Sequence, residues 1–478
     1  MSRARPRVDL LYARSVERSA PSGKRPDYHG SMISFHPGAA EAFERAAANL
    51  IQSVKDFGVE TKRRPTPNFE IHPVANLTEA DIIGSIEMTG RAVDGAGRET
   101  GRFWTSQGRR YGWDGEQYMQ LRKLAERIAN DKSLCGLVSE SFVLELIVGW
   151  LRAKLEGDSV QGLSAFISAR SESAIVEREY VVPLYRTYSS APVQFGDIIV
   201  KPVTKEFLDR WFSKQPGAVP TEYENLRAEH ENKTRSRFQG SLAVHVCVKG
   251  EPIMGSEIAL QSAITASALL RMLSTANLVG GVRSYTQPYG MDGTTTWHHF
   301  EVDGKEIESL NHRELSLGPN SWLIDEAREG LPGLLVGLSD LYSNRNTEYR
   351  SALFDAILTY TRNSLVADPA DKLVFVLVAL ESMLLRGNGE PIQTNLSERM
   401  AFLIGGDLAE RKRIVANVKK LYSMRSKFIH HGQGIDDVAV LDDFLMQAWL
   451  CMIELINRRV AISTREQLLA TLDEMKLS

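Results

Sequence analysis

The apolar residues of this 478-residue chain change their period near residue 340. Before that point, segments with helical spacing alternate with short stretches rich in β-branched residues, which predict strands. After it only the helical period remains, and glycines separate the periodic segments, as expected at helix ends. Six helices are expected there, at 346–363, 369–386, 396–404, 408–430, 437–459 and 465–476. The sequence therefore predicts a mixed α+β N-terminal region, residues 1–335, followed by an all-α domain, residues 336–478.

The N-terminal region has its own predicted elements. Helices are expected at 38–58, 116–130, 141–155 and 260–277. Strands are expected at 179–185, 193–200, 241–248 and 294–302, where β-branched and aromatic residues are frequent. A region of this length has more residues than a single hydrophobic core usually organises, so it could contain two subdomains.

Charge and cysteine usage restrict the class of protein. The net charge of −3 provides no overall field that attracts nucleic acid, so any RNA contact has to come from a local site. The three cysteines, Cys135, Cys247 and Cys451, form neither a disulfide framework nor a CxxC zinc motif. No secretory signal is recognised, and the longest apolar run, 373–380, is too short to span a membrane. We expect a cytoplasmic protein without membrane attachment, metal or other cofactor.

One apolar stripe of the helix expected at 408–430 contains an arginine. Ile414, Val418, Leu421 and Phe428 share this stripe with Arg425, because spacings of three and four residues keep side chains on one helix face. A guanidinium in such a stripe cannot easily lose its charge. It has to be paired, or it has to face a cavity.

Glu381 is the expected partner of Arg425. It directly follows the apolar run 373–380, and its neighbours three and four residues away on either side are apolar. Its carboxylate therefore also needs a partner. The simplest arrangement is an ion pair between Glu381 and Arg425.

Two histidines are expected in the last turn of the same helix, because Gly432 offers a C-terminal cap after His430 and His431. The negative end of a helix favours a protonated imidazole, which suits a proton-transfer group. His430 lies five residues after Arg425, a rotation of about 140°, so the two side chains do not stack on one straight face.

These residues allow two interpretations. In the first, Arg425 binds a phosphate, His430 transfers protons, and Ser426 or Lys427 orients the backbone of an RNA. In the second, the histidine only caps the helix and Arg425 forms a structural ion pair with Glu381, since an Arg-x4-His spacing recurs by chance in many proteins.

Three segments in this order resemble a HEPN domain: the apolar helix that ends at 381–385, the start of the next helix at 396–401, and 421–432. The most similar subtype is the Apea-like one, found in bacterial abortive-infection proteins. The resemblance covers roughly residues 345–460, about a quarter of the chain.

The resemblance implies a helical bundle that forms a homodimer or higher homo-oligomer and joins two Arg-x4-His motifs in one composite site. Active members cut RNA without metal: the ribose 2′-hydroxyl attacks the adjacent phosphate, leaving a 2′,3′-cyclic phosphate and a 5′-hydroxyl. By position, Arg425 would stabilise the phosphate charge and His430 would act as general acid or base. Glu381 matches an acidic position near the motif, and Ser426 matches a polar one. His431 is an additional histidine, which leaves open which imidazole transfers the proton.

The function expected from this resemblance is that of an anti-phage abortive-infection effector. Its endoribonuclease would cut tRNA, mRNA or rRNA, and residues 1–335 would bind a phage-encoded trigger. Two alternatives remain: a non-catalytic HEPN module that binds RNA, a nucleotide or a protein, and the toxin of a toxin–antitoxin pair. Trp449, in the apolar helix expected at 437–459, is a candidate anchor of an interface between copies.

Overall fold

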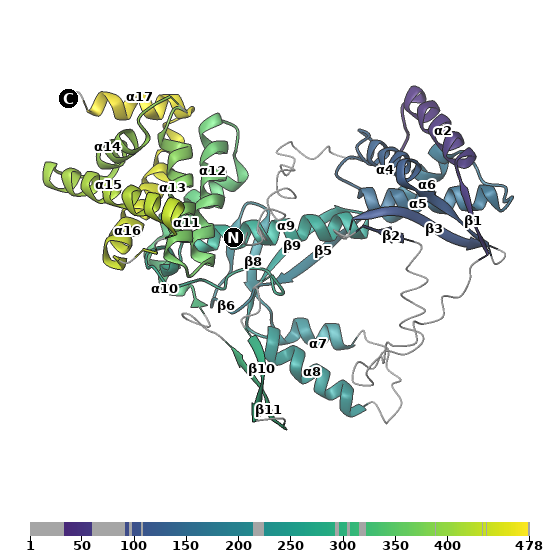
Figure 1. Ribbon diagram of the computed structural model, residues 1–478, viewed down its shortest axis with the longest axis horizontal. Coiled ribbons are helices and arrows are strands. Elements are labelled where there is room, and N and C mark those ends of the chain that lie inside the picture. The colour runs from purple at the N-terminus through teal and green to yellow at the C-terminus, as the bar shows by residue number, and fades with distance from the viewer. Residues whose placement is uncertain are drawn as a thin grey trace. The chain divides into compact units, whose positions relative to one another are not determined.

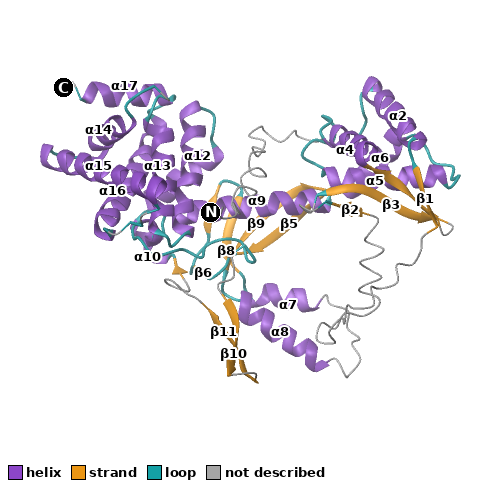
Figure 2. Ribbon diagram, viewed as in Figure 1, coloured by secondary structure: helices purple, strands orange, loops and turns teal. Residues whose placement is uncertain are grey.

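The computed structural model describes residues 33–59, 91–94, 98–106, 109–213, 224–291, 296–303, 306–314, 322–387, 389–432, 434–435 and 437–476. The chain divides into two compact units. The first comprises Met1–Arg178 with Val248–Glu257, and the second comprises Glu179–Cys247 with Ile258–Ser478. Strands and helices alternate up to residue 323, and the described residues beyond it form only helices and loops (Figures 1 and 2). The expected order, an α+β region followed by a helical region, is confirmed.

The first unit combines one antiparallel sheet with helices. The strand order is β1 (Lys55–Val59), β4 (Arg109–Asp114), β3 (Glu99–Ser106) and β2 (Arg91–Val93). The helices are α2 (Pro37–Gln52), α4 (Gly115–Ala129), α5 (Glu140–Leu155) and α6 (Leu163–Ala174). Trp113 of β4 is fully buried in the shared core, where its indole Nε1 donates to the carbonyl oxygen of Leu50 at 3.0 Å.

The helix expected at 38–58 is shorter than the sequence predicts. It ends at Gln52, and residues 55–59 form β1 instead. Val54 and Phe57 continue the helical spacing, but the backbone of this segment pairs with β4. Hydrogen bonding to a neighbouring strand therefore outweighs the local period.

The second unit begins with strands. A sheet has the order β5 (Val176–Pro183), β9 (Leu242–Gly250), β8 (Ile198–Pro202) and β7 (Val193–Phe195). Two smaller pairs are β6 (Thr187–Tyr188) with β12 (Trp322–Leu323), and β10 (Thr296–Asp303) with β11 (Glu306–Glu314). Helices α7 (Lys205–Ser213) and α8 (Glu224–Phe238), the longer α9 (Pro252–Arg271) and the short η3 (Thr275–Asn277) accompany them. Residues 176–178 of β5, 248–250 of β9 and 252–257 of α9 belong to the first unit. The strands expected at 179–185 and 241–248 are confirmed, and so is the part of the strand expected at 294–302 that lies within the described residues, 296–302; 193–200 forms a hairpin of two short strands.

The helical region contains every helix expected from the sequence. The elements are α10 (Asp325–Gly330), α11 (Pro332–Ser343), α12 (Glu348–Tyr360), η4 (Thr361–Leu365), α13 (Pro369–Leu384), α14 (Ile392–Ile404), α15 (Leu408–His431), α16 (Val438–Asn457), η5 (Arg458–Val460) and α17 (Arg465–Met475). Side chains of Thr347, Asp368, Asp407, Asp437 and Thr464 accept backbone hydrogen bonds at helix N-termini. Such caps satisfy amide groups that have no partner inside the helix, so these starts are encoded locally.

One hydrophobic core extends through the second unit. It includes Phe195 and Val244 of the sheet as well as Leu377 of α13 and Leu445 of α16. The boundary expected at 335–345 lies within this unit, because residues from both sides of it share the core. Trp449 is half-buried, and its indole Nε1 donates to the carbonyl oxygen of Met272, at 2.9 Å, within the same unit.

Helix α9 is the one described helix that is long and apolar enough to cross a membrane by length and composition. Its mean hydropathy is 1.3, and 44% of the apolar window is buried inside the protein. Buried core helices have the same composition.

Candidate functional site

Helix α15 carries most of the candidate residues toward its C-terminal end. Asp407 caps its start, and Ile414, Val418 and Leu421 are buried in the core. Gly432 ends the helix in the left-handed region with a φ of 65°, where a residue without Cβ is favoured. The predicted cap is confirmed, and the last turns of the helix emerge from the core.

The expected pair between Arg425 and Glu381 is present. Nη1 of Arg425 on α15 lies 3.7 Å from Oε1 of Glu381 on α13. The side chains are 29% and 22% exposed, so solvent and ligands can reach them. A separation of 3.7 Å is too long for a direct hydrogen bond, so the two groups attract each other without being locked together.

Tyr422 also contacts this pair, a role that could not be inferred from the sequence. Its hydroxyl donates to Oε1 of Glu381 at 2.6 Å. Burial, followed by this hydrogen bond, raises the pKa of the Tyr422 hydroxyl above its ordinary value, so the group stays protonated and continues to donate. The bond fixes the carboxylate beside Arg425, whose Cζ is 6.0 Å from the centre of the Tyr422 ring.

The guanidinium of Arg425 is only partly satisfied. Its Nε is buried and has no hydrogen-bond partner among the described residues. An arginine offers five N–H donors in a planar fork that matches a phosphate or carboxylate. Arg425 therefore combines partial exposure with donors that the described part of the chain does not use.

Both histidines are exposed at the end of α15. The rings of His430 and His431 have centroids 6.4 Å apart and planes at 62°. No described hydrogen bond or ion pair joins either imidazole to Arg425. Arg425 and the two histidines therefore lie within two turns of α15, but their side chains leave the helix on different sides.

Ser426 and Lys427 are exposed next to Arg425. Within the described ranges, neither has a hydrogen-bond or ion-pair partner. Both side chains are therefore accessible to a ligand.

The local charge of α15 is a feature that whole-chain composition concealed. The helix contains seven Lys or Arg residues and one acidic residue, Glu410. Lys420 forms an ion pair with Asp437 at 2.6 Å, whereas no carboxylate in the described segments pairs with Lys412, Arg413, Lys419 or Lys427. A charge count for each predicted helix would have revealed this basic surface.

The described residues contain no group of three or more His, Cys, Asp or Glu side chains placed to hold a metal ion. Cys135 and Cys247 are exposed and Cys451 is buried, and all three are free thiols. Comparison of the chain with protein-family models, curated proteins and solved structures gives no match.

Proposed function

We propose that residues 336–478 form a HEPN-like, metal-independent endoribonuclease that uses Arg425 and His430. One observation carries the proposal: Arg425 is partly exposed and has unused donors, and it lies two turns or less from exposed imidazoles on a basic helix. The resemblance of 345–460 to HEPN domains supplies the reaction class.

The chemistry follows from the residue types. A base removes the proton of a ribose 2′-hydroxyl, and the oxygen attacks the adjacent phosphorus. The bond from phosphorus to the 5′-oxygen breaks, and an acid protonates that leaving oxygen. The products are a 2′,3′-cyclic phosphate and a 5′-hydroxyl. His430, or His431 beside it, would transfer protons, and the Arg425 guanidinium would stabilise the charge on the phosphate.

This reaction needs two proton-transfer groups on opposite sides of one phosphate. We propose that a homodimer supplies them, as the HEPN resemblance implies, and that it also brings Arg425 close to an imidazole, since no described contact within one chain does so. Two α15 helices whose C-terminal ends approach each other would place two guanidinium and two imidazole groups around one RNA strand. Glu381 and Tyr422 would orient Arg425 from within each copy.

Incubation of the purified full chain with total RNA tests the proposal. Wild type should cut RNA and leave 2′,3′-cyclic phosphate ends. Arg425→Ala and His430→Ala should each lower the cleavage rate by about 100-fold or more, and His431→Ala identifies the contribution of the second imidazole. Arg413→Ala, an exposed arginine on another side of α15, is the matched control and should cut normally.

Two results would overturn the nuclease proposal. One is cleavage that persists in both Arg425→Ala and His430→Ala. The other is RNA that is bound and never cut, which would favour a non-catalytic module.

In the cell, we propose that the protein acts as an anti-phage effector whose residues 1–335 respond to infection. Bacteria carrying wild type should restrict phage plaques, and those carrying His430→Ala should not. Equal plaque counts would remove the defence role while leaving the nuclease testable in vitro.

A further inference from the structure

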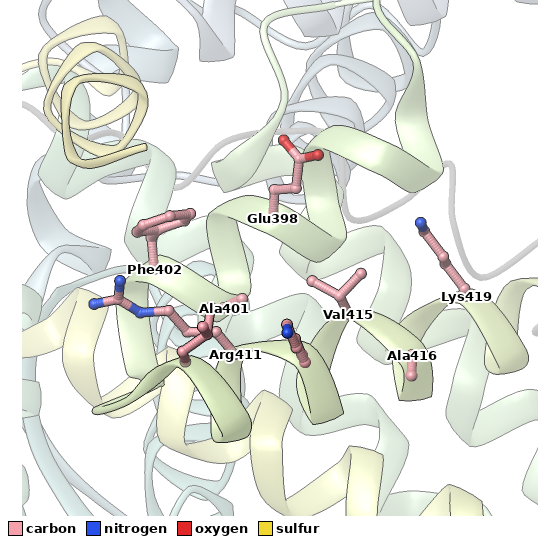
Figure 3. A pocket seen from close by; sticks show the side chains of 9 residues that line it. Glu398, Ala401, Phe402, Arg411, Val415, Ala416 and Lys419 are labelled. Atoms are coloured by element: carbon pink, nitrogen blue, oxygen red, sulfur yellow. The ribbon is translucent and has the colours of Figure 1, made fainter. Parts of the chain in front are cut away.

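A groove of about 410 Å³ lies between α14 and α15 (Figure 3). Its floor is apolar and includes Ala401, Phe402 and Val415. Figure 3 shows Phe402 and Arg411 near one end and Lys419 at the other. The volume is within the range of about 300–1,000 Å³ that is typical of sites for small organic groups.

The charges around the groove are unbalanced. Lys412 and Lys419 are exposed on its rim, and neither has an ion-pair partner in the described part of the chain. Glu398, the acidic residue of the lining, is paired with Lys476 at 3.1 Å. The groove therefore presents free positive charge above an apolar floor, which suits an anionic ligand that also has an apolar face.

The end near Phe402 has the chemistry of a stacking site. The Cζ of Arg411 lies 4.5 Å from the centre of the Phe402 ring, and Nε of Arg411 donates to the carbonyl oxygen of Gly405 at 3.1 Å. This bond holds the guanidinium plane near the ring. Aromatic rings and guanidinium planes are the surfaces on which unpaired bases stack.

The groove lies on the face of α15 that leads to His430. Leu408, Lys412, Lys419, Ser426 and His430 lie within about 40° of one another around the helix axis, at about 100° per residue. Lys412 and Lys419 are about 10 Å apart along the axis, and His430 follows about 16 Å beyond Lys419. A strand that lies in the groove can continue along one helix face to the imidazole.

We propose that this groove binds a single-stranded segment of the RNA substrate upstream or downstream of the cut. A base stacks at Phe402 and Arg411, phosphates contact Lys412 and Lys419, and the strand continues along α15 to His430. The proposal rests on the ribonuclease function and names its substrate class, single-stranded RNA. A duplex does not fit, because its bases are already paired and stacked.

Binding by the full chain, measured separately from cleavage, tests this inference. The probe is a fluorescent, unstructured RNA of about 12 nucleotides, and His430→Ala is present in every sample to prevent cutting. Lys412→Gln/Lys419→Gln removes two charges at the groove. Arg413→Gln/Lys420→Gln is the control, since it removes two charges with the same spacing about 100° around the helix; of these, Arg413 is unpaired in the described chain and Lys420 is paired with Asp437.

Lys412→Gln/Lys419→Gln should weaken RNA binding by about 25-fold at 0.1 M salt. It should also reduce the slope of log affinity against log salt concentration by about 1.4, as expected for two lost phosphate contacts on a single strand. The control pair should change both quantities little. Phe402→Leu, which keeps the floor apolar and removes the ring, should weaken binding by about fivefold or more. A duplex of the same length should compete poorly.

The outcomes separate this inference from the proposed function. The groove assignment would be overturned if the two double variants bound the RNA with equal affinity, or if duplex RNA competed as well as single-stranded RNA. Such a result would leave the groove to an acidic protein segment, even if wild type cuts RNA through Arg425. Conversely, RNA held through Lys412 and Lys419 but not cut by wild type would support the groove and overturn the nuclease.

Discussion

Two arginines of the helical region differ in how fully the chain satisfies them. Arg399 on α14 is 1% exposed, and its guanidinium donates to the carbonyl oxygen of Leu384 at 2.7 Å, to Glu390 at 3.1 Å and to both carboxylate oxygens of Asp473 at 3.1 and 3.2 Å. Arg425 on α15 is 29% exposed, with one ion pair of 3.7 Å.

The difference separates a structural arginine from one that can bind a ligand. Arg399 donates hydrogen bonds to α13, to the segment between α13 and α14, and to α17, so it joins elements that are distant in sequence. Arg425 keeps donors in a planar fork that fits a phosphate. The same residue type thus has opposite uses within one bundle.

The largest expected effect concerns Arg399. Replacement by alanine removes the buried guanidinium that joins Glu390 to Asp473, whereas Asp473 keeps its ion pairs with Arg386 and Lys476. The loss should lower the free energy of unfolding by about 3 kcal/mol, the lower end of the range for a broken buried pair. Urea unfolding followed by circular dichroism measures this change. If Arg399→Ala costs no more stability than Arg425→Ala, the contrast between the two arginines is wrong.

The reverse pattern is expected for Arg425. Arg425→Ala should lower the rate of RNA cleavage by about 100- to 1,000-fold and change the free energy of unfolding by at most about 1 kcal/mol, because the ion pair is long and partly exposed. Arg425→Lys should have intermediate activity, since lysine keeps the charge and loses the fork. A large loss of stability with unchanged cleavage per folded molecule would instead assign Arg425 a structural role.

Asp340 extends the comparison to a fully paired carboxylate. Burial alone would raise its pKa, but hydrogen bonds from Asn344, Arg350 and Arg459 lower the pKa of Asp340 to about 2. The ordinary pKa of an aspartate is 3.8, so folding favours the ionised form of Asp340. The resulting stability, about 1–2 kcal/mol after allowance for screening by solvent, is complete above pH 3.8 and is lost as the pH falls toward 2.

Urea unfolding of wild type and Asp340→Asn between about pH 5 and about pH 3 checks this prediction. The stability difference between the two proteins should shrink as the pH decreases through 3.8. A difference that stays constant would mean that the ion pairs of Asp340 do not depend on its ionisation.

The smallest expected effect concerns two tyrosine hydroxyls. Tyr422→Phe removes the hydrogen bond to Glu381 and should cost about 1 kcal/mol. Tyr360→Phe is the matched control, because the Tyr360 hydroxyl is buried without a hydrogen-bond partner in the described chain, so its loss should be neutral or stabilising. Thermal melting of both variants distinguishes them, and equal losses would contradict the role given to Tyr422.

The helices of the last third could be predicted because their signals are local. The start of α15 at Leu408 and its C-terminal cap at Gly432 were both expected, and both are confirmed. Elements without a local signal were missed or misjudged. Helix α8 has no apolar stripe, and β1 follows a helical spacing that its pairing with the distant β4 overrides.

The candidate site divides in the same way. Glu381 and Arg425 are charges within apolar stretches of two helices, so their pairing could be inferred from the sequence and is present. The hydrogen bond from Tyr422 could not be inferred, because a single tyrosine in a sequence indicates no particular acceptor.

By itself, the sequence determined roughly where the helices of the last third lie and which of their charges require partners, since both depend on neighbours within a few residues. The tertiary structure alone decided which groups remain accessible: the partly exposed guanidinium of Arg425, the exposed His430 and the lysines above the groove. Accessibility depends on how α13, α14 and α15 pack together, and that packing joins residues that are far apart in the chain.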